Sequence, residues 1–295
     1  MGKMRIRVAI VLLMLLFGML SNIEIALAVS WAHLSSADGD IPTPDSGNEQ
    51  TASLVFDFDK DGDNDFLITD RSSGPAITLY RQSGTGWTKY IVDNTENLHI
   101  EAGGAYFDID KDGDFDILMA GDWASNQVWW WENPYPNYNP SVNWNRYTIK
   151  NNGLSYQHDQ AFGDFDGDGK TELAWWGRSS TDSSLYVAEI PSNPKNAGLW
   201  DYSAVNTINP SDPKLYPREG MKAIDIDLDG KLDILGGGGW FKSAGSSYAF
   251  QSIEIERSGV ESRADAGQLI PGGRPEVVFS AGDFEGILAW YEWNG

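Results

Sequence analysis

Hydrophobic and polar positions along this chain alternate in short runs that are separated by glycine, asparagine and proline. One stretch shows the pattern clearly, with apolar or alternating runs at residues 104–107, 115–119, 128–131 and 144–149. Runs of this length, rich in β-branched and aromatic residues, are typical of strands. Beyond residue 28 no stretch has the periodicity of a helix. The pattern therefore predicts an all-β protein.

An acidic loop separates the first two strands of each unit. In residues 164–172 the first, third, fifth and ninth positions are acidic and the sixth is glycine, and residues 57–65, 108–116 and 225–233 repeat this arrangement. Ca²⁺ takes six to eight oxygen ligands, which a short loop supplies when alternate side chains turn inward and glycine permits the bend. We therefore predict about four structural calcium ions. Their ligands would be Asp57, Asp59, Asp61, Asp65, Asp108, Asp110, Asp112, Asp116, Asp164, Asp166, Asp168, Glu172, Asp225, Asp227, Asp229 and Asp233.

The loops recur every 51 to 61 residues, which indicates one repeated unit of four strands. A fifth unit at residues 261–293 keeps strand-like runs at 275–279 and 287–292, but its loop has lost the regular acids, so we expect no metal there. This unit ends after three strands. Residues 31–35 begin with tryptophan, like the fourth strands at Trp87, Trp144 and Trp200, and could supply the missing one. The sequence thus predicts a five-bladed β-propeller of four-stranded blades, closed by the mature N-terminal strand, with calcium loops in four blades.

The N-terminus and the charge indicate where such a protein works. Residues 1–28 combine a basic start, an apolar run and a small-residue cleavage site, which predicts a signal peptide followed by a single propeller domain at 29–295. The alternative is an uncleaved membrane anchor. We expect a secreted protein, extracellular or periplasmic, with no membrane span after signal cleavage, and a monomer.

Charge and cysteine content exclude several classes of function. The formal net charge is −22, and the chain without residues 1–28 is near −24, which makes a nucleic acid a poor partner. The chain has no cysteine, so disulfides and thiol chemistry are excluded. In an exported protein this leaves the metal loops as the expected stabilising links.

Three consecutive tryptophans at residues 129–131 have two interpretations. Their rings could stack on a sugar. Alternate residues of a strand face opposite sides, however, and sheets packed on sheets need large apolar side chains. We expect these tryptophans to lie mainly in the core between blades.

The order of strand, acidic loop and strand, as in residues 161–175, resembles the FG-GAP or VCBS repeats of secreted bacterial proteins and of the integrin α-subunit head. The resemblance covers roughly residues 50–290. It implies a β-propeller whose calcium loops join the first and second strands of each blade. Proteins with such repeats include adhesion heads, carbohydrate-binding modules and a few enzymes, among them polysaccharide lyases.

The resemblance also implies that residues before the first strand and after the second emerge together near the axis, on the face opposite the loops. We call this region the mouth. Its residues differ from blade to blade, which suits one ligand bound across the axis. The alternative is a set of solvated loops with no function. The predicted ligand-binding residues are Arg71, Asp122, Trp123, Arg178, Trp240 and Lys242.

Two reactions could occur at the mouth. His158 could be a general base while Arg263 or Arg178 neutralises a uronate carboxylate for β-elimination, or Glu101 with Glu219 or Asp159 could form the acid and base of a glycosidase. His158 could equally be a hydrogen-bonded structural residue. The favoured function is a binding module for extracellular carbohydrate or another cell-surface ligand. The alternatives are a lyase or glycoside hydrolase at the same mouth, and a protein-adhesion head.

Overall fold

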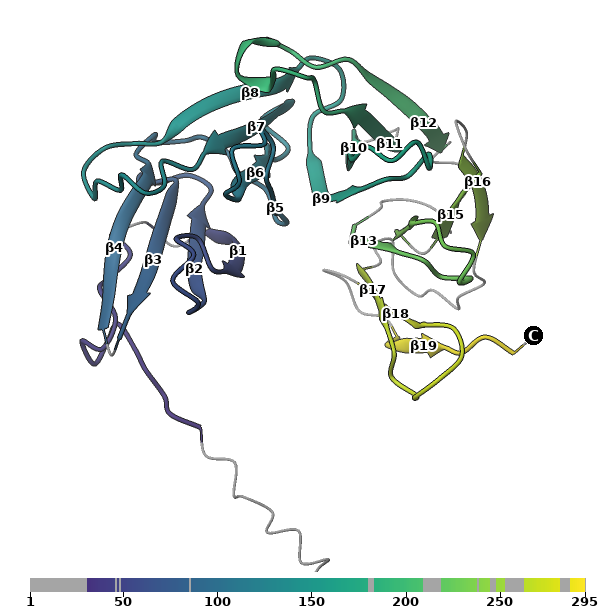
Figure 1. The fold of residues 1–295 in the computed structure, drawn as a ribbon, viewed down its shortest axis with the longest axis horizontal. Coiled ribbons are helices and arrows are strands. Elements are labelled where there is room, and N and C mark those ends of the chain that lie inside the picture. Colours follow the sequence, from purple (N-terminus) through teal and green to yellow (C-terminus); the bar gives the residue numbers. More distant parts are fainter. Residues whose placement is uncertain are drawn as a thin grey trace, which may run out of the picture.

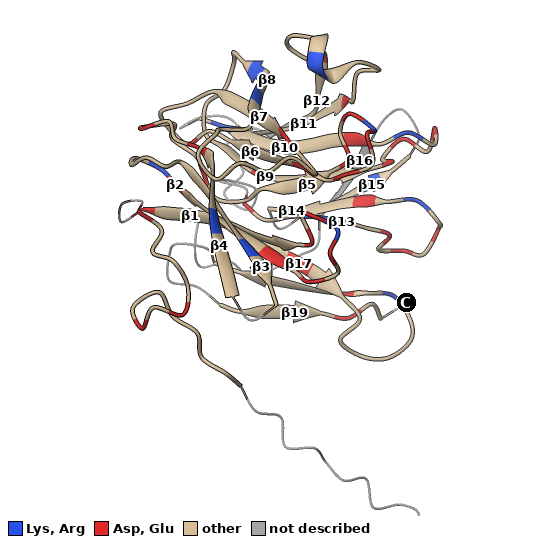
Figure 2. Ribbon diagram, turned by 60° about the vertical axis from the view of Figure 1, so that its left-hand side comes forward, with Lys and Arg blue, Asp and Glu red and all other residues tan. Residues whose placement is uncertain are grey.

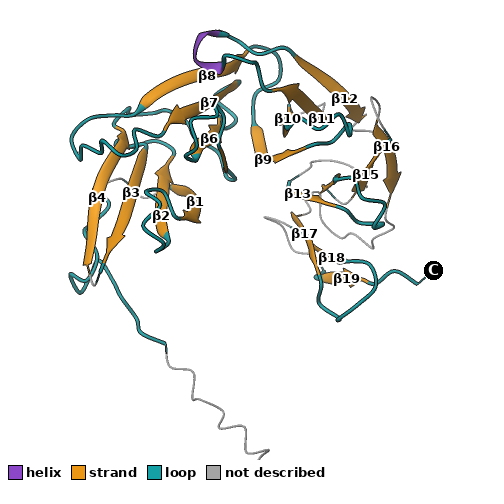
Figure 3. Ribbon diagram, viewed as in Figure 1, coloured by secondary structure: helices purple, strands orange, loops and turns teal. Residues whose placement is uncertain are grey.

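The computed structural model describes residues 31–45, 47, 49–84, 86–179, 183–208, 219–237, 239–244, 248–252, 263–281 and 287–294. The predicted signal peptide lies outside these residues. The described chain is built of β-strands, with one 3₁₀ turn, η1 (Pro194–Asn196), and no α-helix (Figure 3). None of its helical residues forms a segment with the length and apolar character needed to cross a bilayer.

The strands form five antiparallel sheets, each from consecutive strands. The first sheet contains β1 (Gln50–Phe56), β2 (Asp65–Asp70), β3 (Ile77–Ser83) and β4 (Gly86–Asp93). The second contains β5 (Ala105–Phe107), β6 (Asp116–Ala120), β7 (Gln127–Glu132) and β8 (Asn145–Asn151). The third contains β9 (Gln157–Gly163), β10 (Glu172–Arg178), β11 (Ser183–Glu189) and β12 (Tyr202–Ile208). The fourth contains β13 (Met221–Ile224), β14 (Asp233–Gly236), β15 (Gly239–Ser243) and β16 (Tyr248–Ser252). The fifth contains β17 (Arg263–Gly267), β18 (Glu276–Ser280) and β19 (Ala289–Tyr291).

The five sheets follow one another around an arc, with the first strand of each sheet nearest the centre (Figure 1). The first strands of the second to fifth sheets contact their neighbours in turn, β5 with β9, β9 with β13 and β13 with β17. The acidic loops all connect a first strand to a second strand, so they occupy equivalent places in their sheets. Many of the acidic residues lie in loops between strands (Figure 2).

The hydrophobic core consists of four clusters, one between each pair of successive sheets. The period-two geometry of a strand divides the tryptophans among them. Trp129 and Trp131 face the first sheet, whereas Trp130 faces the third. In β10, Trp175 faces the second sheet and Trp176 the fourth. All five side chains are buried, which confirms the predicted place of the tryptophans at 129–131 between sheets.

The N-terminal segment does not complete the last sheet. The fifth sheet has three strands, residues 31–35 are not in a strand, and Trp31 is 93% exposed. Figure 1 shows the first and last sheets apart, with the N-terminal segment leading away from both. The predicted closure is therefore wrong. A fourth-strand tryptophan such as Trp144 or Trp200 is buried between two sheets, whereas Trp31 has no second sheet to pack against.

Candidate functional site

The four acidic loops share one backbone conformation. The fourth position is left-handed in each, at Lys60 (φ 62°), Lys111 (φ 65°), Gly167 (φ 79°) and Leu228 (φ 60°). The glycine at the sixth position is left-handed as well, with φ between 87° and 97°. A side chain at that position would be strained, because L-residues rarely adopt this region. The repeated pattern of acids therefore reflects a repeated loop structure.

The ninth-position acid connects the two ends of its loop. One oxygen of Asp65, Asp116, Glu172 and Asp233 accepts a hydrogen bond from the backbone N–H seven residues earlier, at 2.7–3.2 Å. In the fifth sheet, where the other acids are missing, Glu276 accepts the same hydrogen bond from the Leu269 N–H. In Asp65, Asp116 and Asp233 the second oxygen also accepts a backbone N–H, from the third strand or the residue that follows it. We infer that the ninth residue mainly holds the loop in shape.

Acids of the four loops, in one case with Glu132 of β7, converge in groups that could hold a cation. In each group the ligand atoms lie within 4.8 Å of one another. The groups are Asp57, Asp59 and Asp61; Asp108, Asp110 and Asp116; Asp110, Asp112 and Glu132; Asp164, Asp166, Asp168 and Glu172; and Asp225, Asp227 and Asp229. Asp65 and Asp233, both predicted ligands, are in none of these groups.

Two properties of these loops fit a bound cation. Several buried carboxylate oxygens of the loops, among them Asp108 Oδ1, Glu172 Oε1 and Asp227 Oδ1, have no hydrogen-bond partner, and an orphaned buried acceptor is costly. Burial and neighbouring carboxylates also raise the pKa of Asp116 to about 8 and the pKa of Glu172 to about 7. A divalent cation would supply the missing partner and favour the ionised carboxylates.

Most of the mouth residues predicted from sequence come together from five sheets. The Arg71 guanidinium lies 2.8 Å from a Glu101 oxygen and 3.3 Å from an Asp122 oxygen. Glu219 Oε1 lies 3.2 Å from His158 Nε2 and 3.4 Å from Arg178, and its Oε2 lies 3.2 Å from Arg263. Asp159 accepts a hydrogen bond from the Gly220 N–H at 2.8 Å. We call this set of side chains the hub network.

Most of the hub network is buried. His158 is 2% exposed, Glu219 is fully buried, and Glu101 and Arg178 are each 4% exposed. Burial, followed by the charges of Arg178, Arg263 and Arg71, holds the pKa of His158 well below its usual value, so this imidazole is neutral near pH 7. Burial also raises the pKa of Glu101. The network ties neighbouring sheets together through charges that compensate one another.

The predicted ligand-binding residues divide into three groups. Trp123 is 64% exposed beside the buried Asp122, and Arg71 is partly exposed. Arg178 is buried and lies over the Tyr156 ring, 3.7 Å from its centroid. Trp240 and Lys242 are not at the mouth, so their assignment was wrong. Both lie in β15, where Trp240 packs between the fourth and fifth sheets and Lys242 Nζ contacts Asp227 and Asp229 of the acidic loop.

Sequence reasoning missed two mouth residues, His99 and Tyr156. His99 Nδ1 lies 3.1 Å from Asp122 Oδ2, and its ring meets Trp123 edge-on at 6.2 Å between centroids. Both residues have left-handed backbones, with φ 60°, and Asp159 has φ 39°. Such conformations are uncommon outside glycine and concentrate at functional sites. His99 and Tyr156 each lie two residues before a predicted residue, Glu101 and His158, but no residue pattern in the sequence shows the strain.

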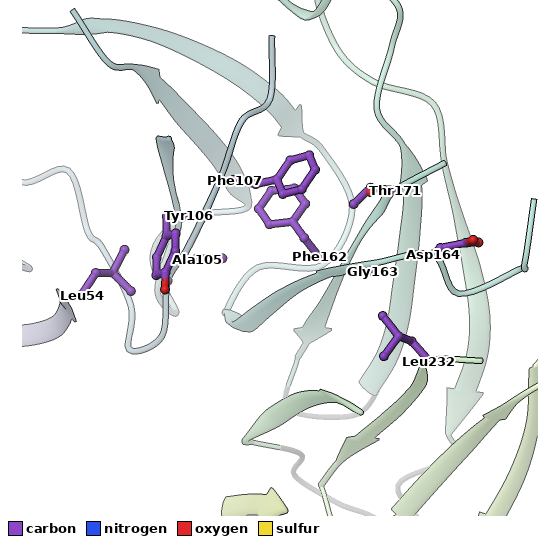
Figure 4. A pocket seen from close by; sticks show the side chains of 10 residues that line it. Leu54, Ala105, Tyr106, Phe107, Phe162, Gly163, Asp164, Thr171 and Leu232 are labelled. Atoms are coloured by element: carbon purple, nitrogen blue, oxygen red, sulfur yellow. The ribbon is translucent and has the colours of Figure 1, made fainter. Parts of the chain in front are cut away.

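The first strands of three sheets, β1, β5 and β9, also line a hollow of about 530 Å³, together with Leu232 of the fourth acidic loop (Figure 4). Leu54, Tyr106, Phe107, Phe162 and Leu232 line it, and Phe107 stacks on Phe162 with 4.9 Å between ring centroids. Asp164 and Thr171, the residues at the start and near the end of the third loop, border the same hollow. Its wall is thus mainly apolar, in contrast to the charged hub network.

Residues 108–175 match the model of the FG-GAP-like repeat family. No curated protein matches the chain. Among solved structures, the rhamnogalacturonan lyase YesW is 15% identical, with a TM-score of 0.48 over 82% of this chain and 49% of that one. The biofilm matrix protein Bap1 of V. cholerae is 16% identical, with a TM-score of 0.45 over 80% of this chain and 36% of that one. A Bacillus licheniformis rhamnogalacturonan lyase of type PL11 is 14% identical, with a TM-score of 0.42 over 78% of this chain and 46% of that one. The chain spans half or less of the length of each of these three structures. Residues 108–175 carry an FG-GAP-like repeat, which confirms the resemblance predicted from the sequence.

Proposed function

We propose that this protein is a secreted five-bladed β-propeller, stabilised by calcium, that binds extracellular carbohydrate at its mouth. The observation that carries the proposal is the setting of Trp123. This indole is 64% exposed, and beside it lie the His99 ring and the carboxylate of Asp122. Aromatic faces next to polar groups suit the apolar faces and hydroxyls of sugars.

The backbone around the mouth supports a preorganised site. His99, Tyr156 and Asp159 are held in left-handed conformations by contacts between sheets. A Cβ on Gly103 would lie 2.8 Å from the Asp159 Cα, and one on Gly220 would lie 2.3 Å from the Ala264 nitrogen, so the chains approach closely here. Strain that surrounding structure enforces is typical of ligand-binding regions. The mouth is therefore better suited to binding than a set of solvated loops.

Burial of the hub network favours binding over catalysis. A catalytic group must reach hydrogen-bonding distance of its substrate. His158 and Glu219 are almost completely buried and contact each other. The same His158 nitrogen faces Glu101 at 3.8 Å and Glu219 at 3.2 Å, so the ring occupies the space nearest both carboxylates. A glycosidic bond and its water would need that space.

One observation favours a β-eliminating lyase as the second candidate. The neutral His158 ring has the protonation state of a general base and lies near the arginines that could bind a uronate. A lyase would release unsaturated uronates, which absorb in the ultraviolet. Assays on a polysaccharide panel with wild type and His158→Ala would detect this activity. Turnover that His158→Ala abolishes while sugar binding persists would replace the binding module with the lyase.

We expect Trp123→Ala to weaken carbohydrate binding at least tenfold, which corresponds to about 1.4 kcal/mol, while the melting temperature stays unchanged. The exposed indole contributes area to the ligand but little to the core. Calorimetric titration of the polysaccharides that bind wild type would measure the change. Trp31→Ala is the matched control, because Trp31 is more exposed and precedes the sheets. Equal affinity of both variants for every ligand would rule out Trp123 as the contact.

A further inference from the structure

Three of the four acidic loops are contacted by a basic side chain from outside the loop, at the same aspartate. Arg81 of β3 pairs with Asp59, Lys195 of η1 pairs with Asp110 at 2.5 Å, and Lys242 of β15 pairs with Asp227. These aspartates are the third residues of their loops. Their basic partners are about two-thirds buried, with side-chain exposures of 31–32%. Each cation is thus held against its loop by the fold.

The loop at residues 164–172 lacks such a partner. Among the described residues, no basic side chain contacts Asp166, its third residue. Lys170 pairs with Asp168, but it belongs to the loop itself and is 66% exposed. An exposed ion pair of this kind contributes little to stability, and its lysine is easily displaced from the carboxylate. In the described structure, the third loop therefore has no fixed positive charge from another segment at its third residue.

The strand register explains part of this difference. In β2 and β3, Phe66 pairs with Tyr80. Because the strands are antiparallel, the next residue of β3, Arg81, lies opposite Asp65. In β14 and β15, Ile234 pairs with Phe241, so Lys242 takes the equivalent place. In the third sheet the register pairs Glu172 with Glu189. A carboxylate thus occupies the place where two other sheets have a base.

The third loop also has a second feature that suits a cation, a buried carboxylate oxygen without a hydrogen-bond partner, which it shares with Asp108 and Asp227 of the second and fourth loops. Its four acids converge within 4.8 Å, and Glu172 is 2% exposed. One oxygen of Glu172 accepts the Phe165 N–H at 2.7 Å, whereas the other, Oε1, has no partner although it is buried. A ligand with positive charge would satisfy that oxygen.

We propose that the four loops are of two kinds: the loop at 164–172 is the one high-affinity calcium site, and Arg81, Lys195 and Lys242 act as built-in counter-cations that weaken calcium binding in the other three. The inference rests on the calcium binding in the proposed function. Calcium affinity depends on the charge count of the ligands, so a fixed positive charge in the loop competes with the ion. The fold would then depend mainly on a single ion.

The test is calorimetric titration of the chelator-treated, desalted full-length mature protein with calcium chloride. We expect one site that binds at least tenfold more tightly than the rest. Asp166→Asn and Glu172→Gln should remove this step, whereas Lys170→Gln, the matched control, should leave it nearly unchanged. Circular dichroism would check that each variant is folded.

The neutralised variants provide the converse test. Arg81→Gln, Lys195→Gln and Lys242→Gln should each add one tight site, with affinity raised about tenfold over that loop in wild type. Four equivalent sites in wild type, or glutamine variants that bind no more calcium than wild type, would overturn the inference. The calcium part of the proposed function fails in a different way, with no binding heat in wild type or in any variant.

Discussion

Chelation of calcium is expected to lower the melting temperature by roughly 5–10 °C for each tightly bound ion. A ligand at one hundred times its dissociation constant stabilises the native state by about 2.7 kcal/mol, and 1 kcal/mol shifts the melting temperature of a domain of this size by about 2–4 °C. The ion acts by cancelling repulsion among carboxylates that the loop holds within 4.8 Å. Differential scanning calorimetry with calcium and with excess EDTA would measure the shift.

The control for this experiment is the addition of excess calcium to the chelated protein, which should restore the original curve. Glu172→Gln should melt lower than wild type in calcium and respond less to EDTA. A melting curve that is the same in calcium and in EDTA would refute a structural role for the metal.

Glu219→Ala is expected to destabilise the protein by about 3–5 kcal/mol, the usual effect of removing one partner from a buried ion pair. The Glu219 carboxylate contacts His158, Arg178 and Arg263, and Arg178 stays buried when the carboxylate is removed. The melting temperature should fall by about 6–20 °C. Glu219→Gln should have a smaller effect, because the amide still offers an oxygen to the guanidinium groups.

Asp265→Ala is the matched control for Glu219→Ala. Asp265 pairs with Lys222 at a similar distance, 3.3 Å, but its side chain is 73% exposed. Exposed ion pairs contribute little to the free energy of unfolding, so the melting temperature should change by less than about 4 °C. If both alanine variants melt at the same temperature, the hub network does not stabilise the contacts between sheets.

The residues of the hub network explain why the sequence could predict the site only in part. Glu101 and Glu219 precede first strands, and His158 and Arg263 lie at the start of first strands, in four different sheets. The repeat predicts that such positions meet at the axis. The predicted places of Trp240 and Lys242 failed because β14 ends at Gly236 and β15 begins at Gly239, so both residues lie within the third strand of their sheet. A shift of a few residues moves a side chain from the mouth into the core or to the opposite end of the sheet.

Local sequence patterns specify the strands, the four acidic loops, the decayed fifth unit and the burial of the tryptophans, because each depends on local spacing and on the period-two alternation of strands. Packing of the sheets specifies which carboxylates receive backbone N–H groups, which loops receive Arg81, Lys195 or Lys242, and whether residues 31–35 join the last sheet. These outcomes depend on contacts between residues that are distant in the chain. A local pattern cannot specify which of several nearby charges pairs with another, because that choice follows from strand register and from the way neighbouring sheets pack.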